Sequence, residues 1–373
     1  MKLQVLQENF AKSINIASRF TSVRAQLPVL SNIHLQAKSN KLYLSATNLE
    51  NSVSLSVGAK VDEEGEITIP ARVVNDIVST LNPGTLTIAV EKDVVKLSSD
   101  GFKTSISGMN ESDFPSVPKK IGKDAVLFNS KDFLTSLNKV IFSTSSDETR
   151  PLLTGVLFKI EPKKVSLVAT DGFRLSSSGF PIDIKEGLED IILPKGVLSE
   201  LVRLGSDEEE IAYSYKKGDS QVVFRVGSMV LSSRVLEGEY PDYKKIIPKE
   251  LGISANLDKK ELHQAIKLAS VFAKDSANVV KIGVKTSGLE VSSESQYSGS
   301  QTTKVEAKVE GDKLSPKSDF LIAFNYRFID DFLSIIQGDD IELSFNEPNT
   351  PGVFKDLSEK KYLHLIMPVK LQE

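Results

Sequence analysis

Two short elements of the sequence carry residues that could do covalent chemistry. SLNK, at Ser136 to Lys139, has the Ser-x-x-Lys spacing, and KTSG, at Lys285 to Gly288, contains a Lys-Thr pair. In enzymes that use such elements, the serine attacks a carbonyl carbon from the start of a helix. The apolar spacing places Ser136 inside a helix that begins near Lys131, and KTSG lies in a hairpin where Ser-Gly is ordinary turn chemistry. We therefore predict no catalytic residues.

Other reactive chemistry has little support in the composition. The sequence has no cysteine, which excludes disulfides, thiolate metal sites and cysteine nucleophiles. Its three histidines, His34, His263 and His364, lie far apart, so we expect no histidine-rich metal centre. The sequence contains neither a Gly-x-x-x-x-Gly-Lys phosphate loop nor a Gly-x-Gly-x-x-Gly fingerprint. We expect no metal and no cofactor.

Length and charge indicate a soluble protein of two or three domains. The chain has 373 residues, of which 40% are hydrophobic, so it can bury large cores. No N-terminal apolar run is long enough for a signal peptide, and no segment approaches the ~20 apolar residues of a membrane span. We expect a cytoplasmic protein without a membrane partner. The formal net charge of −4 argues against a generally basic nucleic-acid binder but allows a local basic surface, because the acids are bunched.

The sequence repeats with a period of about 123 residues. LPVLSNIHL (27–35) aligns without gaps with RPLLTGVLF (150–158), so that Pro28 matches Pro151. SATN (45–48) meets VATD (168–171) at the same offset, and VKIGVKTSGLEVSS (280–293) belongs to a weaker third copy. Three consecutive units of this size fill the chain. We expect domain boundaries at 1–122, 123–249 and 250–373.

Each unit contains two helices and several strands. The first helix of each unit has an apolar face, formed by Phe10, Ile14 and Ala17, by Phe133, Leu137 and Val140, and by Leu262, Ile266 and Ala269. The second helices follow strands in the segments 67–81, 191–204 and 321–336, and Pro70 and Pro194 stand where two of them begin. Alternating segments such as TLTIAV (85–90) predict further strands. The fold class is therefore α+β, with sheets dominant.

Cations gather on the polar faces of the predicted helices. Those on or just after the first helices are Lys12, Arg24, Lys139 and Lys267, and those at the starts of the second helices are Arg72, Lys195 and Arg327. Acids early in a helix and cations later can reflect the helix dipole alone. Alternatively, these helices turn a positive face towards a phosphate backbone. The pattern by itself leaves both interpretations open.

The octet ATDGFRLS (169–176) is the most distinctive turn of the chain. It follows the strand pattern VSLVA (165–169); Asp171 can bond its own backbone, and Gly172 accepts a positive φ. By itself the octet indicates a tight turn between strands. Together with EYPDYKKIIP (239–248), YLHLIMPVKL (362–371) and the threefold repeat, however, it resembles the bacterial sliding clamp family, the β subunit of the replicative DNA polymerase. The likeness spans the whole chain.

This resemblance implies an architecture and a mechanism. Members of the family are head-to-tail homodimers, in which three clamp-fold domains per chain form a six-domain ring with helices lining the hole and sheets outside. Double-stranded DNA, which presents one charge per ~1.7 Å of axis, would be encircled without regard to sequence. The ring would then stay on the DNA because it is closed around the duplex. Individual contacts with phosphates can therefore be weak, and the ring can slide.

The resemblance also implies a pocket for short peptides of the replicative polymerase, the clamp loader and other partners that carry the clamp-binding motif. Carried over by position, the pocket consists of Leu153, Thr170, Gly172, Phe173, Arg174, Leu175, Pro241, Ile246, Leu365, Met367 and Pro368. Ordinary core packing is the competing interpretation for Leu153, Leu175, Ile246 and Leu365. Met367 is a stronger candidate, because a flexible thioether suits a surface with several partners.

Departures from the family pattern affect this pocket. Phe173 stands where many members have a histidine, and Pro151 and Leu152 replace an often aromatic segment. We therefore expect peptide binding to depend mainly on burial of the peptide's Leu and Phe side chains.

For the dimer interface the resemblance implies Ile106, Val271 and Phe272, although packing inside the domain competes for Phe272. A β-rich scaffold unrelated to DNA would keep the repeats without a ring, and the mass in solution would distinguish it from a dimer.

Overall fold

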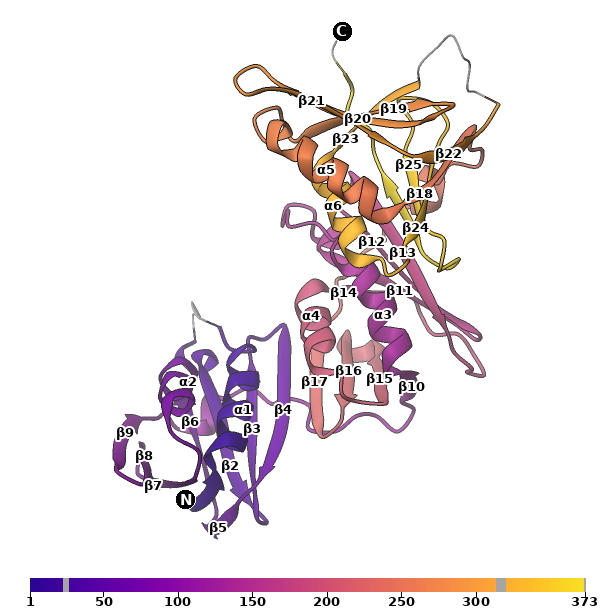
Figure 1. Ribbon diagram of the computed structural model, residues 1–373. Coiled ribbons are helices and arrows are strands. Elements are labelled where there is room, and N and C mark those ends of the chain that lie inside the picture. Colours follow the sequence, from indigo (N-terminus) through magenta and orange to yellow (C-terminus); the bar gives the residue numbers. More distant parts are fainter. Residues whose placement is uncertain (23–26, 313–319, 372–373) are drawn as a thin grey trace. The chain divides into compact units, whose positions relative to one another are not determined.

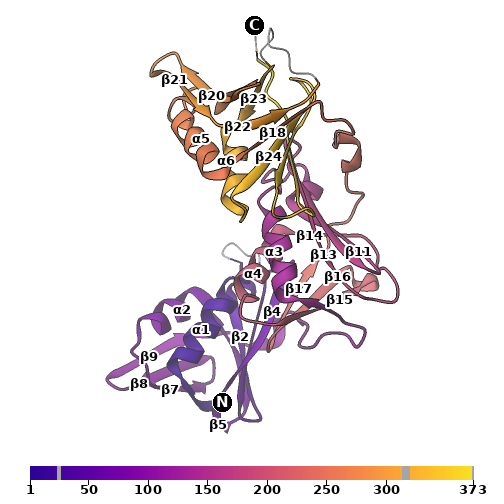
Figure 2. The ribbon, with the colours of Figure 1, turned by 45° about the vertical axis from the view of Figure 1, so that its right-hand side comes forward.

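The computed structural model describes residues 1–22, 27–312 and 320–371, and the chain packs as two compact units. The first unit contains Met1–Lys131 and Ser199–Val235, and the second contains Asp132–Leu198 and Leu236–Glu373. The middle third of the chain therefore contributes to both units (Figure 1 and Figure 2). Each unit holds two antiparallel sheets.

The first unit has a five-stranded and an eight-stranded sheet. The five-stranded sheet has the order β5 (Lys60–Glu63), β1 (Lys2–Leu6), β7 (Thr85–Glu91), β8 (Val94–Ser99) and β9 (Phe102–Ser107). The eight-stranded sheet has the order β10 (Val126–Asn129), β15 (Glu210–Lys216), β16 (Gln221–Val226), β17 (Met229–Arg234), β4 (Asn51–Gly58), β3 (Lys41–Thr47), β2 (Asn32–Lys38) and β6 (Gly65–Pro70). It joins the first and middle thirds of the chain, because β17 pairs with β4.

The second unit has a nine-stranded and a four-stranded sheet. The larger sheet has the order β14 (Ile191–Pro194), β11 (Gly155–Glu161), β12 (Lys164–Thr170), β13 (Arg174–Pro181), β26 (Leu363–Ile366), β25 (Gly352–Asp356), β24 (Asp340–Phe345), β18 (Ile253–Asp258) and β22 (Ala307–Glu310). The smaller has the order β21 (Gly299–Val305), β20 (Gly288–Ser295), β19 (Val279–Lys285) and β23 (Phe320–Asn325). Pairing of β13 with β26 joins the middle and last thirds.

Each helix in the described part of the chain begins directly after a strand, as predicted for the second helix of each unit. The helices are α1 (Gln7–Ser18), α2 (Ala71–Thr80), α3 (Ser130–Ile141), α4 (Lys195–Leu204), α5 (Lys259–Ala273) and α6 (Tyr326–Ile335). Pro70 and Pro194 end the strands that precede α2 and α4, so their missing N–H groups cost no helical hydrogen bond. Asp258 and Asn325 cap α5 and α6 by accepting bonds from backbone N–H groups. No helix in the described part of the chain is long and apolar enough to cross a membrane.

Apolar periodicity explains which faces are buried. The predicted stripe of α1, formed by Phe10, Ile14 and Ala17, has no exposed surface, and α1 packs on β3 and β4 of its own unit. Strands alternate in the same way, as β18 does with Ile253, Ala255 and Leu257 facing the core. The predicted helices and strands, including the paired strands β19 and β20, are therefore confirmed.

Candidate peptide-binding and DNA-binding surfaces

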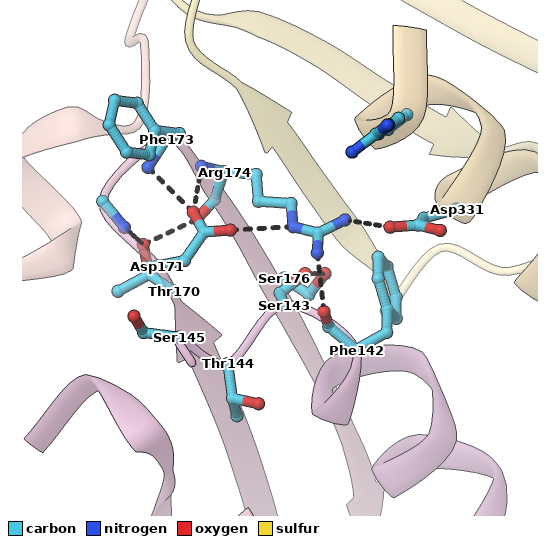
Figure 3. Close-up of polar contacts among 12 residues, drawn as sticks. Phe142, Ser143, Thr144, Ser145, Thr170, Asp171, Phe173, Arg174, Ser176 and Asp331 are labelled. Carbon is cyan, nitrogen blue, oxygen red and sulfur yellow. Dashed lines mark hydrogen bonds and ion pairs between the residues drawn. The ribbon is translucent and has the colours of Figure 1, made fainter. Parts of the chain in front are cut away.

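The turn between β12 and β13 is fixed by its own polar groups. The Oδ1 atom of Asp171 accepts hydrogen bonds from the backbone N–H groups of Phe173 and Arg174, at 2.9 and 3.0 Å. Thr170 Oγ1 accepts from Gly172 N at 3.0 Å and donates to Arg174 O at 2.6 Å (Figure 3). Gly172 has φ 92°, which a residue with a Cβ rarely adopts. The turn therefore holds the Phe173 side chain, 59% exposed, away from the core.

The Arg174 side chain is committed to structural contacts. Its guanidinium donates to Asp171 Oδ2 at 3.1 Å, to Asp331 Oδ2 at 2.5 Å and to Phe142 O at 2.8 Å (Figure 3). It also lies over the rings of Phe142 and Phe328, 5.2 and 4.7 Å from their centroids. These contacts hold the turn against α6 and the residue that follows α3, and because the Arg174 side chain is only 10% exposed it offers little surface to a ligand.

The C-terminal strand completes this surface. Leu175 of β13 lies opposite Leu365 of β26 in the sheet register, and Met367 N donates to Phe173 O at 2.8 Å. Leu175 and Leu365 are 0% and 1% exposed, and they belong to a buried apolar cluster that also contains Leu157, Val168, Ile192 and Val353. The backbone pairing thus places Met367 beside Phe173 above an apolar floor.

The segment 239–248 adds a further wall. Tyr240 packs against the same apolar cluster, and its hydroxyl accepts a hydrogen bond from Thr170 N at 3.1 Å. Burial raises the pKa of Tyr240, so the hydroxyl stays protonated at neutral pH. Pro241 is exposed, and Ile246 is 41% exposed, whereas Ile247 packs inwards. Ile246 therefore keeps surface that a ligand could contact, whereas Ile247 belongs to the core.

A groove runs along the chain after β26. It has a volume of about 400 Å³ and is lined by Leu321, Ile322, Ala323, Pro348, Asn349 and the segment 367–371. Met367 and Pro368 are half-buried, while Val369 and Leu371 are 37% and 40% exposed. Apolar side chains of a bound peptide would lose water-exposed area in such a groove.

The eleven residues predicted for the peptide pocket all lie in the second unit, in two groups. Gly172, Phe173, Pro241, Ile246, Met367 and Pro368 keep accessible surface, whereas Leu153, Thr170, Leu175 and Leu365 are buried and the Arg174 side chain is nearly so. Core packing, the competing interpretation, holds for Leu153, Leu175 and Leu365. It does not hold for Ile246.

Sequence reasoning missed a buried polar chain beside the pocket. Ser143 and Ser176 share a hydrogen bond of 2.7 Å, and the Ser176 hydroxyl lies 2.8 Å from Nδ1 of His364. Burial, together with the positive charge of Arg174, lowers the pKa of His364 to about 3. Asp331 was also missed, although aligning 321–336 with 191–204 would have placed it over Glu200.

Five of the seven cations predicted to bind DNA are exposed: Lys12, Arg72, Lys195, Lys267 and Arg327. Arg72 is 92% exposed and lies 4.0 Å from Asp76, a surface pair that contributes little to stability. Arg24 lies outside the described residues. Exposed cations on helices can attract phosphates without contacting bases.

The prediction for Lys139 is wrong. Its side chain is 3% exposed, its Nζ forms an ion pair with Glu359, and it lies 5.8 Å from the centroid of the Tyr362 ring. Burial lowers the pKa of Lys139 from its ordinary value, although nearby Asp356 opposes the shift. Lys139 therefore joins α3 to the segment before β26 and presents no charge to DNA. Ser136, its neighbour in SLNK, is also buried within α3 and not at the helix start.

The apolar residues expected at a dimer interface differ in exposure. Val271 of α5 is 59% exposed and Phe272 is partly exposed, so both have surface to offer. Ile106 of β9 is only 5% exposed, so its side chain offers little surface to a second copy. Among the described residues, no group of three or more His, Asp or Glu side chains could hold a metal ion.

Comparison with known proteins covers the full chain. Residues 1–118, 128–242 and 244–370 match the N-terminal, central and C-terminal domains of the DNA polymerase III beta subunit family. The beta sliding clamp of Synechocystis is 32% identical over 395 residues, with 100% of both chains covered.

Solved structures give the same result. The DNA polymerase III beta subunit from Thermotoga maritima is 27% identical with a TM-score of 0.91, and the DNA polymerase sliding clamp from Bacillus subtilis is 25% identical with a TM-score of 0.93. Both alignments cover 100% of each chain. With three consecutive clamp domains over its length, the chain belongs to the DNA polymerase III beta subunit, or beta sliding clamp, family of non-catalytic processivity factors.

Proposed function

We propose that two copies of this chain close head to tail into a ring around duplex DNA, and that partners dock on the ring through the pocket around Phe173 and Met367. The observation that carries this proposal is the match of three consecutive clamp domains over the full chain. We place the domain boundaries at 1–122, 123–249 and 250–373. The ring acts in the cytoplasm on chromosomal DNA.

The exposed cations Lys12, Arg72, Lys195, Lys267 and Arg327 supply the attraction to DNA. Each neutralises a phosphate without contacting a base, so the ring has no preferred sequence. Retention depends on closure, which lets the contacts stay weak enough for sliding. Arg24 belongs to this set by its position in the sequence.

The peptide pocket binds a short segment with Leu and Phe side chains, carried by the replicative polymerase, the clamp loader and other partners. Phe173, Ile246 and Met367 are accessible apolar side chains above a floor of buried leucines. Burying each Leu or Phe of the peptide contributes roughly 1.5–3 kcal/mol. Arg174 acts on this site by holding the turn.

Encirclement makes a prediction that a conventional DNA binder does not share. Once loaded on a nicked circle, the protein should remain bound through gel filtration and should be lost when the circle is cut to a linear duplex. Val271→Asp should fail to be retained even on circles, because a buried carboxylate at the interface opens the ring. Equal retention on circular and linear DNA would refute encirclement.

Charge reversal tests the cationic helix surfaces. The double variant Lys195→Glu/Lys267→Glu should bind DNA at least tenfold more weakly, and the slope of log affinity against log salt should fall by about 3.6, because a ring of two chains loses four phosphate contacts. Lys38→Glu, which reverses an exposed charge at the end of strand β2, is the control. An unchanged salt slope in the double variant would contradict these contacts.

A further inference from the structure

The second helices of the three clamp domains carry an acid at the same position. α2, α4 and α6 each have 10 residues, and each follows directly on a strand. The sixth residues of these helices are Asp76, Glu200 and Asp331. Because the rest of the three helix sequences differs, a carboxylate that recurs at one position of the repeat indicates a contact that recurs in each domain.

Two of these acids tie one clamp domain to the next. Glu200 of the central domain accepts a hydrogen bond at 2.7 Å from Nε of Arg19, which follows α1 in the N-terminal domain. Asp331 of the C-terminal domain accepts one at 2.5 Å from Nη1 of Arg174, at the start of β13 in the central domain (Figure 3). We call these two ion pairs the clasps. In both clasps the later domain supplies the acid and the earlier domain supplies the arginine.

Asp76 of the N-terminal domain is the third acid of the set. Its side chain is 71% exposed, and the ion pair that it makes with Arg72 of the same helix, at 4.0 Å, lies in water and contributes little. In the proposed head-to-tail ring, the domain that comes before the N-terminal domain is the C-terminal domain of the other copy. The order seen in the clasps therefore assigns the cation for Asp76 to that C-terminal domain.

Lys274 is placed to be this cation. When the apolar stripes of α1 and α5 are aligned, Val271 takes the position of Arg19. Lys274 lies three residues after Val271, on the same side of α5, and it is the first residue after its helix, as Arg19 is after α1. Both Val271 and Lys274 are exposed. The C-terminal domain thus presents a long, flexible cation next to a residue that we expect at the dimer interface.

The second position from which a clasp arginine reaches out offers no cation in the C-terminal domain. Arg174 ends the turn between β12 and β13, and the corresponding turn of the C-terminal domain joins β20 to β21. Residues 295–300 of that turn contain neither Lys nor Arg. The charged contact therefore falls to the end of α5.

We infer that Asp76 of one copy forms an ion pair with Lys274 of the other copy at both seams of the ring. This inference rests on the proposed head-to-tail ring, and it adds a charged contact beside the apolar Val271. Each junction between neighbouring domains is then closed by an acid at the same helix position. The pair at the seam differs from the clasps in one respect, because both of its side chains are exposed before the ring closes.

Charge reversal and charge exchange in the full-length protein test the pair. Asp76→Lys and Lys274→Asp should each raise the Kd of the dimer at least tenfold at low salt, because two like charges then meet at both seams. The double variant Asp76→Lys/Lys274→Asp restores opposite charges and should return the Kd to within threefold of wild type. Lys260→Asp reverses an exposed charge at the other end of α5 and should change the Kd less than twofold. Sedimentation equilibrium over a dilution series measures each Kd.

The outcomes separate the ion pair from the ring. An unchanged Kd in both single variants, or no recovery in the double variant, would overturn the pair and leave the ring intact. At about 1 M salt, where the Debye length is about 3 Å, the difference between wild type and the single variants should shrink. A difference that high salt leaves undiminished would also overturn the pair. Wild-type protein that stays monomeric throughout the dilution series would refute the ring and the pair together.

Discussion

Replacing Arg174 by alanine should abolish measurable binding of a Leu/Phe peptide and lower the free energy of unfolding by about 3 kcal/mol. The guanidinium bridges two carboxylates and a carbonyl, and its removal leaves Asp171, whose side chain is 15% exposed, without its charge partner. The other carboxylate, Asp331, is 47% exposed and can be solvated, which keeps the loss at the low end of the range for broken buried pairs. Titration calorimetry and urea unfolding measure the two effects.

Two conservative variants separate positioning from simple stability. Arg174→Lys keeps the positive charge but lacks the planar guanidinium. Compared with Arg174→Ala, it should restore part of the stability and little of the peptide affinity. Asp331→Asn removes one ion pair and should cost about 1 kcal/mol, because its carboxylate is half exposed. Retention on circular DNA should persist in both. Unchanged peptide affinity in Arg174→Ala would show that the turn needs no anchor.

Most of the fold could be predicted because its signals are local or repeated. The spacing of Phe10, Ile14 and Ala17 predicts which face of α1 is buried, and the match of Pro28 with Pro151 locates two equivalent 3₁₀ turns. Turn chemistry at Asp171 and Gly172 predicted the tight turn between β12 and β13. The repeat makes the prediction of helices and strands more reliable, because weak patterns that recur at one offset support one another.

The failures concern burial that depends on distant segments. Lys139 was assigned to a polar helix face, yet Glu359, over 200 positions later, covers it and neutralises its charge. Likewise, no residue near Arg174 in sequence indicates that its ion-pair partner is Asp331. Such side-chain partners are set by the sheets that cross the domain boundaries, which no local pattern encodes.

The buried His364 should make the second unit sensitive to acid. The pKa of His364 is about 3 in the folded protein, because burial disfavours the charged ring, against about 6.5 in an unfolded chain. Between these values the unfolded chain binds a proton that the folded protein does not, so stability is full above pH 6.5 and falls as the pH drops towards 3. The loss between pH 7 and pH 4 should be about 3 kcal/mol.

The first unit shows which side chains can replace Ser176 and His364 in a control variant. In the first unit, β4 and β17 pair in the same register as β13 and β26 do in the second, and the apolar pair Val53 and Leu231 occupies the positions of Ser176 and His364. The variant Ser176→Val/His364→Leu therefore copies a pairing that the fold already accepts and removes the titrating ring. His34, whose pKa is also lowered by burial, contributes equally to both proteins and cancels. Urea unfolding from pH 7 to pH 4 should show the stability difference between wild type and variant shifting by about 3 kcal/mol in favour of the variant, whereas a constant difference would mean that His364 does not control acid stability.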